Sequence, residues 1–100
     1  NEIVNAINKV IESKGGVAVS DGNYQAILPL PVAGLMSTDD GYKVAEHYHK
    51  LDTKAHDLGS PLRAPFMTMS FMALLVIPDL KLSDKGLFDG TTFSFTDLYS

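Results

Sequence analysis

The stretch GVAVSDGNYQAIL, residues 16–28, decides the fold because it reads as two strands joined by a tight turn. Both ends of the stretch consist of β-prone residues. Asp21-Gly22 between them is a strong hairpin signal, since glycine tolerates the positive φ that a tight primed turn requires. Pro29 and Pro31 stop the second strand, because proline cannot donate a hydrogen bond to a ladder. The sequence therefore predicts an antiparallel hairpin here.

Helical periodicity flanks this hairpin on both sides. Before it, the spacing of apolar residues and the Lys14-Gly15 terminus predict a helix over about residues 2–14. After it, Ser37 is the predicted N-cap of a helix over about residues 38–58, which Gly59 and Pro61 close. The apolar stripe of this second helix consists of Val44, Tyr48, Leu51, Ala55 and Leu58.

The segment after Pro65 is ambiguous between helix and strand. Met67, Met69 and Phe71 alternate with polar residues, as they would in a strand. The proline and the continuous apolar run 72–75 instead favour a buried helix that ends before Pro78. We favour the helix and leave the strand alternative open for residues 66–75. A loop is predicted over residues 81–86, and a last strand over residues 91–95.

These elements predict an α+β fold: a single compact domain over residues 1–100, with a small antiparallel sheet packed against two or three helices. The chain is 45% hydrophobic and 20% charged, as globular domains are. A helical pattern that is already under way at Asn1 predicts a piece of a longer polypeptide. The absence of cysteine excludes disulfides and thiolate chemistry, and fits a cytoplasmic location.

Charge and hydropathy exclude two classes of partner. The net charge is −4 and the basic residues are scattered, so we expect no nucleic acid as a partner. The longest apolar run falls far short of the ~20 residues that a membrane-spanning helix needs, so we expect no membrane.

The histidines make the longer predicted helix a candidate metal site. His49, Asp52 and His56 lie at i, i+3 and i+7, so they share a face where a divalent metal could bind. A solvated polar face with helix-spaced charge pairs is the reading we favour. His47 and His49 are two positions apart and diverge by about 200° on a helix, so they cannot share one metal. We therefore predict no metal ligand, no cofactor-binding residue and no catalytic residue in this chain.

Residues 28–37, LPLPVAGLMS, form the first candidate interface. Two prolines stiffen this loop and Gly34 lets it turn, so its apolar side chains either plug their own domain or dock on a neighbour. The methionines and phenylalanines of residues 66–72 predict a core cluster or a contact to another domain, with an adaptable binding surface as the alternative. The interface candidates are Leu30, Pro31, Leu35, Met36, Met67 and Met69.

The LPLPVAGLMS run resembles the signature of the adenine deaminase C-terminal domain, a family within the amidohydrolase superfamily. AINKVIESKGGVAVSDG before it and LGSPLRAPFMTMSFMALLVIPDLKLSDKGLFD after it resemble the same family, so the likeness runs from about Ala6 to Phe95. The resemblance implies that the parent protein is a hydrolase of purine metabolism. Such an enzyme converts adenine and water to hypoxanthine and ammonia.

The resemblance also implies that the catalytic machinery lies outside this chain. The family's catalytic domain is a TIM barrel that holds manganese or iron through histidine and aspartate side chains at strand ends. By this resemblance, the metal would activate a water molecule there for attack on C6 of the purine. These 100 residues would then be an inactive C-terminal accessory domain, with no metal of its own and with the barrel of the same chain as its partner. Homo-oligomerisation is left open, and an independent metal- or ligand-binding module on the His49/Asp52/His56 face is the alternative.

Overall fold

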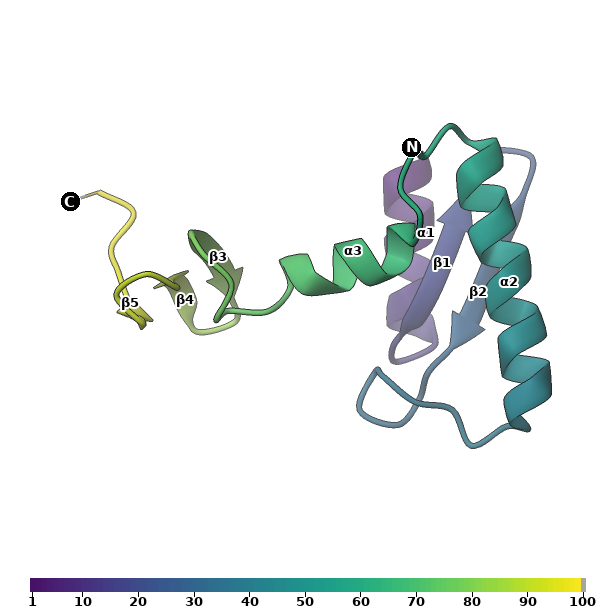
Figure 1. The fold of residues 1–100 in the computed structure, drawn as a ribbon, viewed down its shortest axis with the longest axis horizontal. Coiled ribbons are helices and arrows are strands. Elements are labelled where there is room, and N and C mark those ends of the chain that lie inside the picture. The colour runs from purple at the N-terminus through teal and green to yellow at the C-terminus, as the bar shows by residue number, and fades with distance from the viewer. Residues whose placement is uncertain (100) are drawn as a thin grey trace. The chain divides into compact units, whose positions relative to one another are not determined.

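The computed structural model of the protein describes residues 1–99 (Figure 1). The contacts within the chain divide it into two compact units, Asn1–Arg63 and the residues from Ala64 onward. Helices and small antiparallel sheets follow one another along the chain, so the predicted α+β class is confirmed. Of the helices formed by residues 1–99, none combines the length and the apolarity that crossing a membrane requires.

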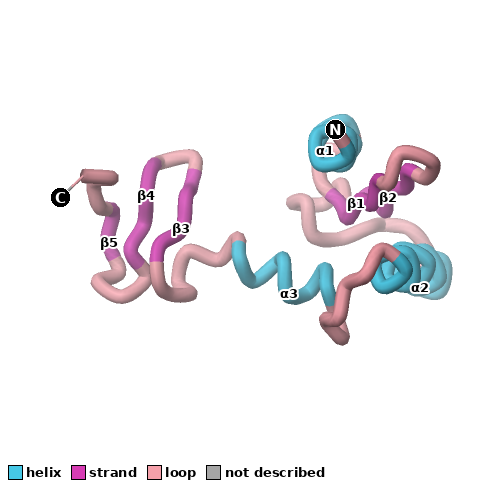
Figure 2. Tube along the Cα trace, turned by 90° about the horizontal axis from the view of Figure 1, so that it is seen from above, coloured by secondary structure: helices cyan, strands magenta, loops and turns pink. Residues whose placement is uncertain are grey.

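The first unit is a two-stranded sheet between two helices. Its elements are α1 (Glu2–Glu12), β1 (Gly16–Ser20), β2 (Gln25–Pro29) and α2 (Gly41–Asp57). The strands are antiparallel, with Gly16 opposite Pro29 and Ser20 opposite Gln25, so the predicted hairpin is confirmed. Seen from above in Figure 2, α1 and α2 lie on opposite faces of this sheet.

α1 ends in a Schellman motif. The amide of Lys14 donates to the carbonyl of Ile11 at 3.0 Å, and the amide of Gly15 donates to that of Val10 at 2.9 Å. The helix therefore ends at Glu12, and Lys14 rather than Gly15 takes the left-handed position, with φ 58°. This corrects the predicted end at residue 14.

The hairpin turn is closed by the side chain of Asp21. Its Oδ1 accepts from the amides of Asn23 and Tyr24 at 3.1 and 2.7 Å, while its own amide donates to the Tyr24 carbonyl at 2.9 Å. Gly22 has φ 83°, the positive value that the first central residue of a primed turn needs. The Asp-Gly signal therefore works through both residues, the aspartate by capping and the glycine by its backbone.

The core of the first unit lies between the sheet and α2. Val19 and Leu28 are 6% and 4% exposed, and Leu51 of α2 is completely buried. Side chains alternate along a strand, and the strand register places Val19 and Leu28 on the same face of the sheet. Ser20, on the other face, donates to the carboxylate of Glu2 in α1. The Val19 face is therefore the one that α2 covers.

α2 begins three residues later than predicted, and its N-cap is Asp40 rather than Ser37. Asp40 Oδ1 accepts from the amides of Tyr42 and Lys43 at 3.1 and 3.2 Å. Ser37 instead accepts from the amide two residues further on, at 3.1 Å, within the preceding turn. A carboxylate at the N-cap both accepts these bonds and interacts favourably with the helix dipole, which explains the correction.

The second unit contains a short helix and a three-stranded antiparallel sheet. The elements are α3 (Pro65–Met72), β3 (Leu80–Ser83), β4 (Gly86–Asp89) and β5 (Ser94–Phe95), with β4 in the middle of the sheet. The favoured helix after Pro65 is confirmed as far as Met72, and the proline occupies its first turn.

A small aromatic cluster centres on Phe88 in β4, which is 9% exposed. The rings of Phe93 and Phe95 meet it edge to face, with centroids 5.5 and 5.4 Å away. The loop predicted over residues 81–86 is wrong, because Leu80–Ser83 pairs with Gly86–Asp89 as a hairpin. Asp84 and Lys85 form the turn of this hairpin, and Gly86 follows it at φ 127°, a backbone conformation that glycine accepts.

Candidate functional site

The predicted interface loop contains a tight turn over residues 32–36, which we call the Val32–Met36 turn. The amide of Val32 donates to the carbonyl of Met36 at 3.0 Å, and the amide of Met36 donates back at 3.1 Å. Ala33 and Gly34 at its tip have φ of 56° and 73°, and two successive positive values are typical of a type I′ turn. Local backbone bonds therefore fix the shape of this turn.

The loop is also fastened to the backbone that follows α1. The amide of Leu30 donates to the carbonyl of Gly15 at 3.0 Å. A Cβ atom on Gly15 would lie 2.4 Å from the Cα atom of Gly34, closer than real side chains allow. The absence of a side chain at Gly15 therefore lets the Val32–Met36 turn pack directly against the backbone between α1 and β1.

The Val32–Met36 turn exposes its apolar side chains. Leu35 is 74% exposed and Met36 is 56% exposed, while Leu30 is half-buried and Pro31 is exposed. The alternative in which this loop only completes its own core is therefore wrong for Leu35 and Met36. Their role as an interface stays a prediction.

The methionines of α3, in the second unit, are exposed too. Met67, Met69 and Met72 are 55%, 66% and 58% exposed, so these methionines form no core within the second unit. The physical reason is their spacing: apolar residues two apart on a helix diverge by about 200° and make no single buried stripe. Met67 and Met69 stay predicted interface residues.

The metal-site candidates do not come together as ligands. Nδ1 of His56 lies 2.8 Å from the backbone oxygen of Asp52, and Nε2 lies 2.8 Å from that of Leu62. Carbonyl oxygens only accept, so both ring nitrogens act as donors, and these bonds raise the pKa of His56. Neither nitrogen then offers a lone pair to a metal. His49 is exposed on the same helix, and no metal-binding group of three or more ligand side chains exists within residues 1–99.

An ion pair that no sequence pattern indicated connects the hairpin turn to α2. Lys54 Nζ lies 2.5 Å from Oδ2 of Asp21 and 5.1 Å from the centroid of the Tyr24 ring. The hydrogen bond between the Lys54 ammonium and the Asp21 carboxylate lowers the pKa of Asp21 and raises the pKa of Lys54. Asp21 already carried a turn signal, but nothing in the sequence identified its distant partner. The pair is structural, because it connects two elements of one unit.

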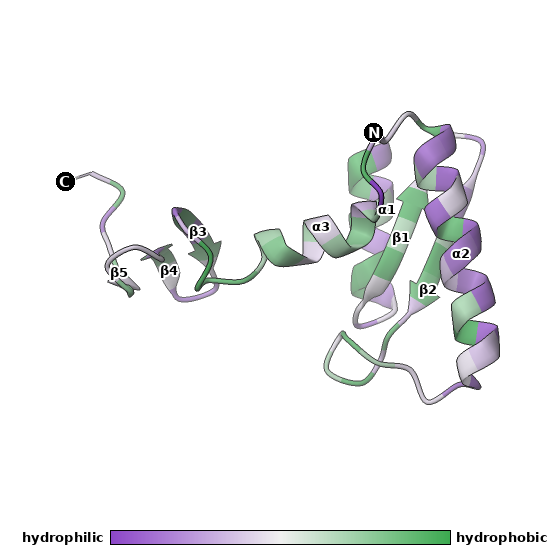
Figure 3. Cartoon of the chain, in the orientation of Figure 1, coloured by the Kyte–Doolittle hydropathy of each residue, from purple (hydrophilic) through white to green (hydrophobic). Residues whose placement is uncertain are grey.

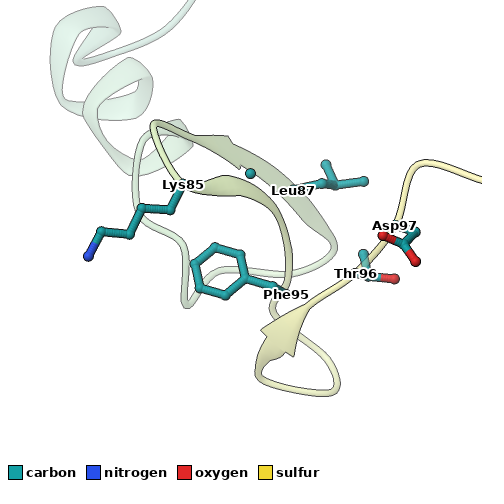
Figure 4. Close-up of a pocket in the computed structure, with 6 residues that line it drawn as sticks. Lys85, Leu87, Phe95, Thr96 and Asp97 are labelled. Carbon is teal, nitrogen blue, oxygen red and sulfur yellow. The ribbon is translucent and has the colours of Figure 1, made fainter.

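The second unit has a pocket beside β4 and β5 (Figure 4). Phe95 and Leu87 supply its apolar lining, and Lys85, Thr96 and Asp97 supply polar groups. Lys85 extends away from Asp97 in Figure 4, so the two charges do not converge on one point. This arrangement does not offer an acid, a base and a nucleophile directed at a common atom, which a hydrolytic site requires.

The family described as adenine deaminase C-terminal domain matches residues 1–94, so the chain belongs to that family. A relative named adenine deaminase from Methanosarcina mazei is 54% identical over 99 residues, which are 99% of this chain and 18% of the relative. Two further relatives also carry the name adenine deaminase. The one from Sulfurovum sp. is 53% identical over 95% of this chain, and the one from Parabacteroides distasonis is 50% identical over 98% of it; each match covers 18% of the relative. No solved structure matches the chain.

The chain thus spans about 18% of the length of the curated relatives it matches. The matched part is the C-terminal domain named by the family, and its residues 1–94 include all of the first unit. That the domain occupies the full range 1–100 stays a prediction.

Proposed function

We propose that these residues form an accessory domain of an adenine deaminase, the hydrolase that converts adenine and water to hypoxanthine and ammonia. In this proposal the domain supports the catalytic barrel or a subunit interface and does not itself catalyse the reaction. The parent enzyme would work in the cytoplasm. Membership of the family and relatives that carry the name adenine deaminase support this assignment.

The exposure of the Val32–Met36 turn is the observation that carries the docking role. A hydrogen-bonded turn that presents Leu35 and Met36 to solvent is rigid before any partner arrives. A rigid apolar projection loses little conformational entropy when it binds, so burial of its side chains contributes directly to affinity. A barrel surface with a matching apolar depression is the partner we propose.

The manganese or iron of the proposed parent does not fit this chain's residues. Both nitrogens of His56 donate to carbonyl oxygens, and residues 1–99 contain no cluster of metal-ligating side chains. The reaction therefore takes its metal from the barrel in our proposal. The contribution of this domain is mechanical: it holds neighbouring segments in place.

Substitution of Leu35 by aspartate in the parent enzyme tests the docking role. We expect Leu35→Asp to lower the thermal midpoint of the parent by several degrees and to leave that of the 100-residue chain unchanged, because Leu35 is exposed there. Leu82→Asp is the matched control, since Leu82 is 83% exposed and belongs to the second unit. Equal effects of the two substitutions in the parent, or an effect of Leu35→Asp in the short chain, would contradict the proposal.

A further inference from the structure

The two-stranded sheet of the first unit leaves the outer edge of β1 unpaired. The register pairs each β1 residue with one β2 residue, and no third strand of residues 1–99 joins this sheet. An antiparallel ladder uses the backbone groups of alternate residues only, and the groups of the residues between them point to the opposite side. The unpaired groups of β1 can therefore be identified from the register.

Two backbone bonds at the ends of the ladder settle which residues face outward. Leu30 donates to Gly15 at one end, and Asp21 donates to Tyr24 at the other. Odd-numbered residues of β1 consequently bond to β2, and even-numbered residues face away from it. The free edge offers three amides and three carbonyls, from Gly16, Ala18 and Ser20.

The β1 edge lacks the features that natural proteins use to protect an exposed edge. Such edges are usually interrupted by charged side chains, by proline or by bulges. β1 reads GVAVS and contains none of them, and Figure 3 shows both strands as largely hydrophobic. The opposite edge, on β2, does end in Pro29, which has no amide to donate. Of the two edges, that of β1 is the one suited to another strand.

α1 is placed to cover a strand beyond β1. In Figure 2 it lies over the β1 side of the sheet, whereas α2 lies over the other face. Ile3 and Ile11 of α1 are 71% and 67% exposed, and Ile7 between them is 51% exposed. A helix buries its apolar stripe when an element lies beneath it, so this stripe has no partner within the first unit. A further strand beside β1 would extend the sheet under the same layer as α1.

We propose that the free edge of β1 pairs with a β-strand from the remainder of the parent polypeptide, outside these 100 residues. The length of the relatives supports this occupant, because the chain accounts for only 18% of each of them. The added strand would accept from the amides of Gly16, Ala18 and Ser20 and would complete a sheet with helices on both faces. This inference rests on the proposed function only in that the domain is part of a longer chain.

Residue-resolved hydrogen exchange, compared between the parent enzyme and the 100-residue chain, tests the pairing. We expect the amides of Ala18 and Ser20 to exchange at least about 100-fold more slowly in the parent, because only there are they hydrogen-bonded. The amides of Val17 and Val19 bond to β2 in both proteins and serve as the internal control for global stability. The proposal would be overturned if the exchange rates of the Ala18 and Ser20 amides, divided by those of Val17 and Val19, were the same in the two proteins.

A second copy of the chain is the competing occupant, and sedimentation distinguishes it. If Ala18 and Ser20 become protected in the 100-residue chain as it dimerises, β1 pairs with another β1 and the proposal is wrong. The proposal is supported if the 100-residue chain is monomeric and its Ala18 and Ser20 amides exchange rapidly, while the same amides exchange slowly in the parent enzyme. Adenine turnover is scored separately, so a parent that deaminates adenine without this protection would overturn the strand pairing alone.

Discussion

Replacing Leu51 by alanine should remove much of the stability of the first unit. Leu51 is completely buried between α2 and the sheet face that carries Val19 and Leu28. The substitution deletes about three carbon groups, worth about 2.4 kcal/mol of transfer free energy, and the cavity brings the loss to about 3–5 kcal/mol. At about 0.05–0.15 kcal/mol per residue, a unit of this size has only a few to roughly nine kcal/mol in total.

Urea unfolding followed by far-ultraviolet circular dichroism measures this loss, because most of the helical signal comes from α1 and α2. Leu58→Ala is the matched control, since Leu58 caps the same helix but is 52% exposed. We expect the control to cost less than about 1 kcal/mol. If the two variants unfold at the same urea concentration, Leu51 is not the centre of the core and this description of the unit is refuted.

Three further predictions concern the backbone and the charges of the first unit. Gly15→Ala should destabilise the first unit by at least about 2 kcal/mol, because Gly15 has φ 124° and a Cβ atom there would clash with Gly34. The control is Gly41→Ala, which should not destabilise the unit because a Cβ atom at Gly41 meets nothing within 4 Å. Thermal unfolding of both variants measures the difference. The pKa of Asp21 is lowered by its hydrogen bond with Lys54. The contribution of Asp21 to stability is therefore present above its unfolded-state pKa and is lost as the pH falls through its folded-state pKa. Asp21→Asn should make the free energy of unfolding depend less on pH in the acid range. The pKa of His56 is raised above 6.5 by its hydrogen bonds to backbone carbonyls, and NMR titration of the imidazole should show this. The contribution of His56 to stability is therefore full below pH 6.5 and is lost as the pH rises through the folded pKa.

Sequence patterns predicted the elements whose signals are local. The hairpin follows from Asp21 and Gly22, because the carboxylate closes the turn and the glycine accepts the positive φ. The apolar stripe of α2 correctly contained Leu51, its one buried residue. Both signals act over a few residues, so no knowledge of the partner elements was needed.

Predictions failed where the outcome depended on competition or on distant contacts. Ser37 and Asp40 are both good N-caps, and the sequence could not say which of them would start α2. The ion pair between Asp21 and Lys54 exists only because the hairpin packs on α2. The exposure of Met69 could not be foreseen either, since burial requires an element to pack against, and α3 presents apolar residues on several sides.

The candidate interface was located by sequence, but its geometry was not. The prolines and Gly34 predicted a stiff turn, and the structure adds the close contact between Gly15 and Gly34 that seats it. The open edge of β1 was invisible in the sequence, because a strand covered on both faces has the same apolar pattern whether or not its edge is paired.

Adenine turnover by the purified 100-residue chain, measured as hypoxanthine formation with manganese present, is the most direct test of the account. We predict no turnover above the buffer control, and ready turnover by the full-length parent enzyme under the same conditions. Hypoxanthine production by the short chain, proportional to its concentration and retained after repeated purification, would contradict the claim that this domain acts only as an accessory.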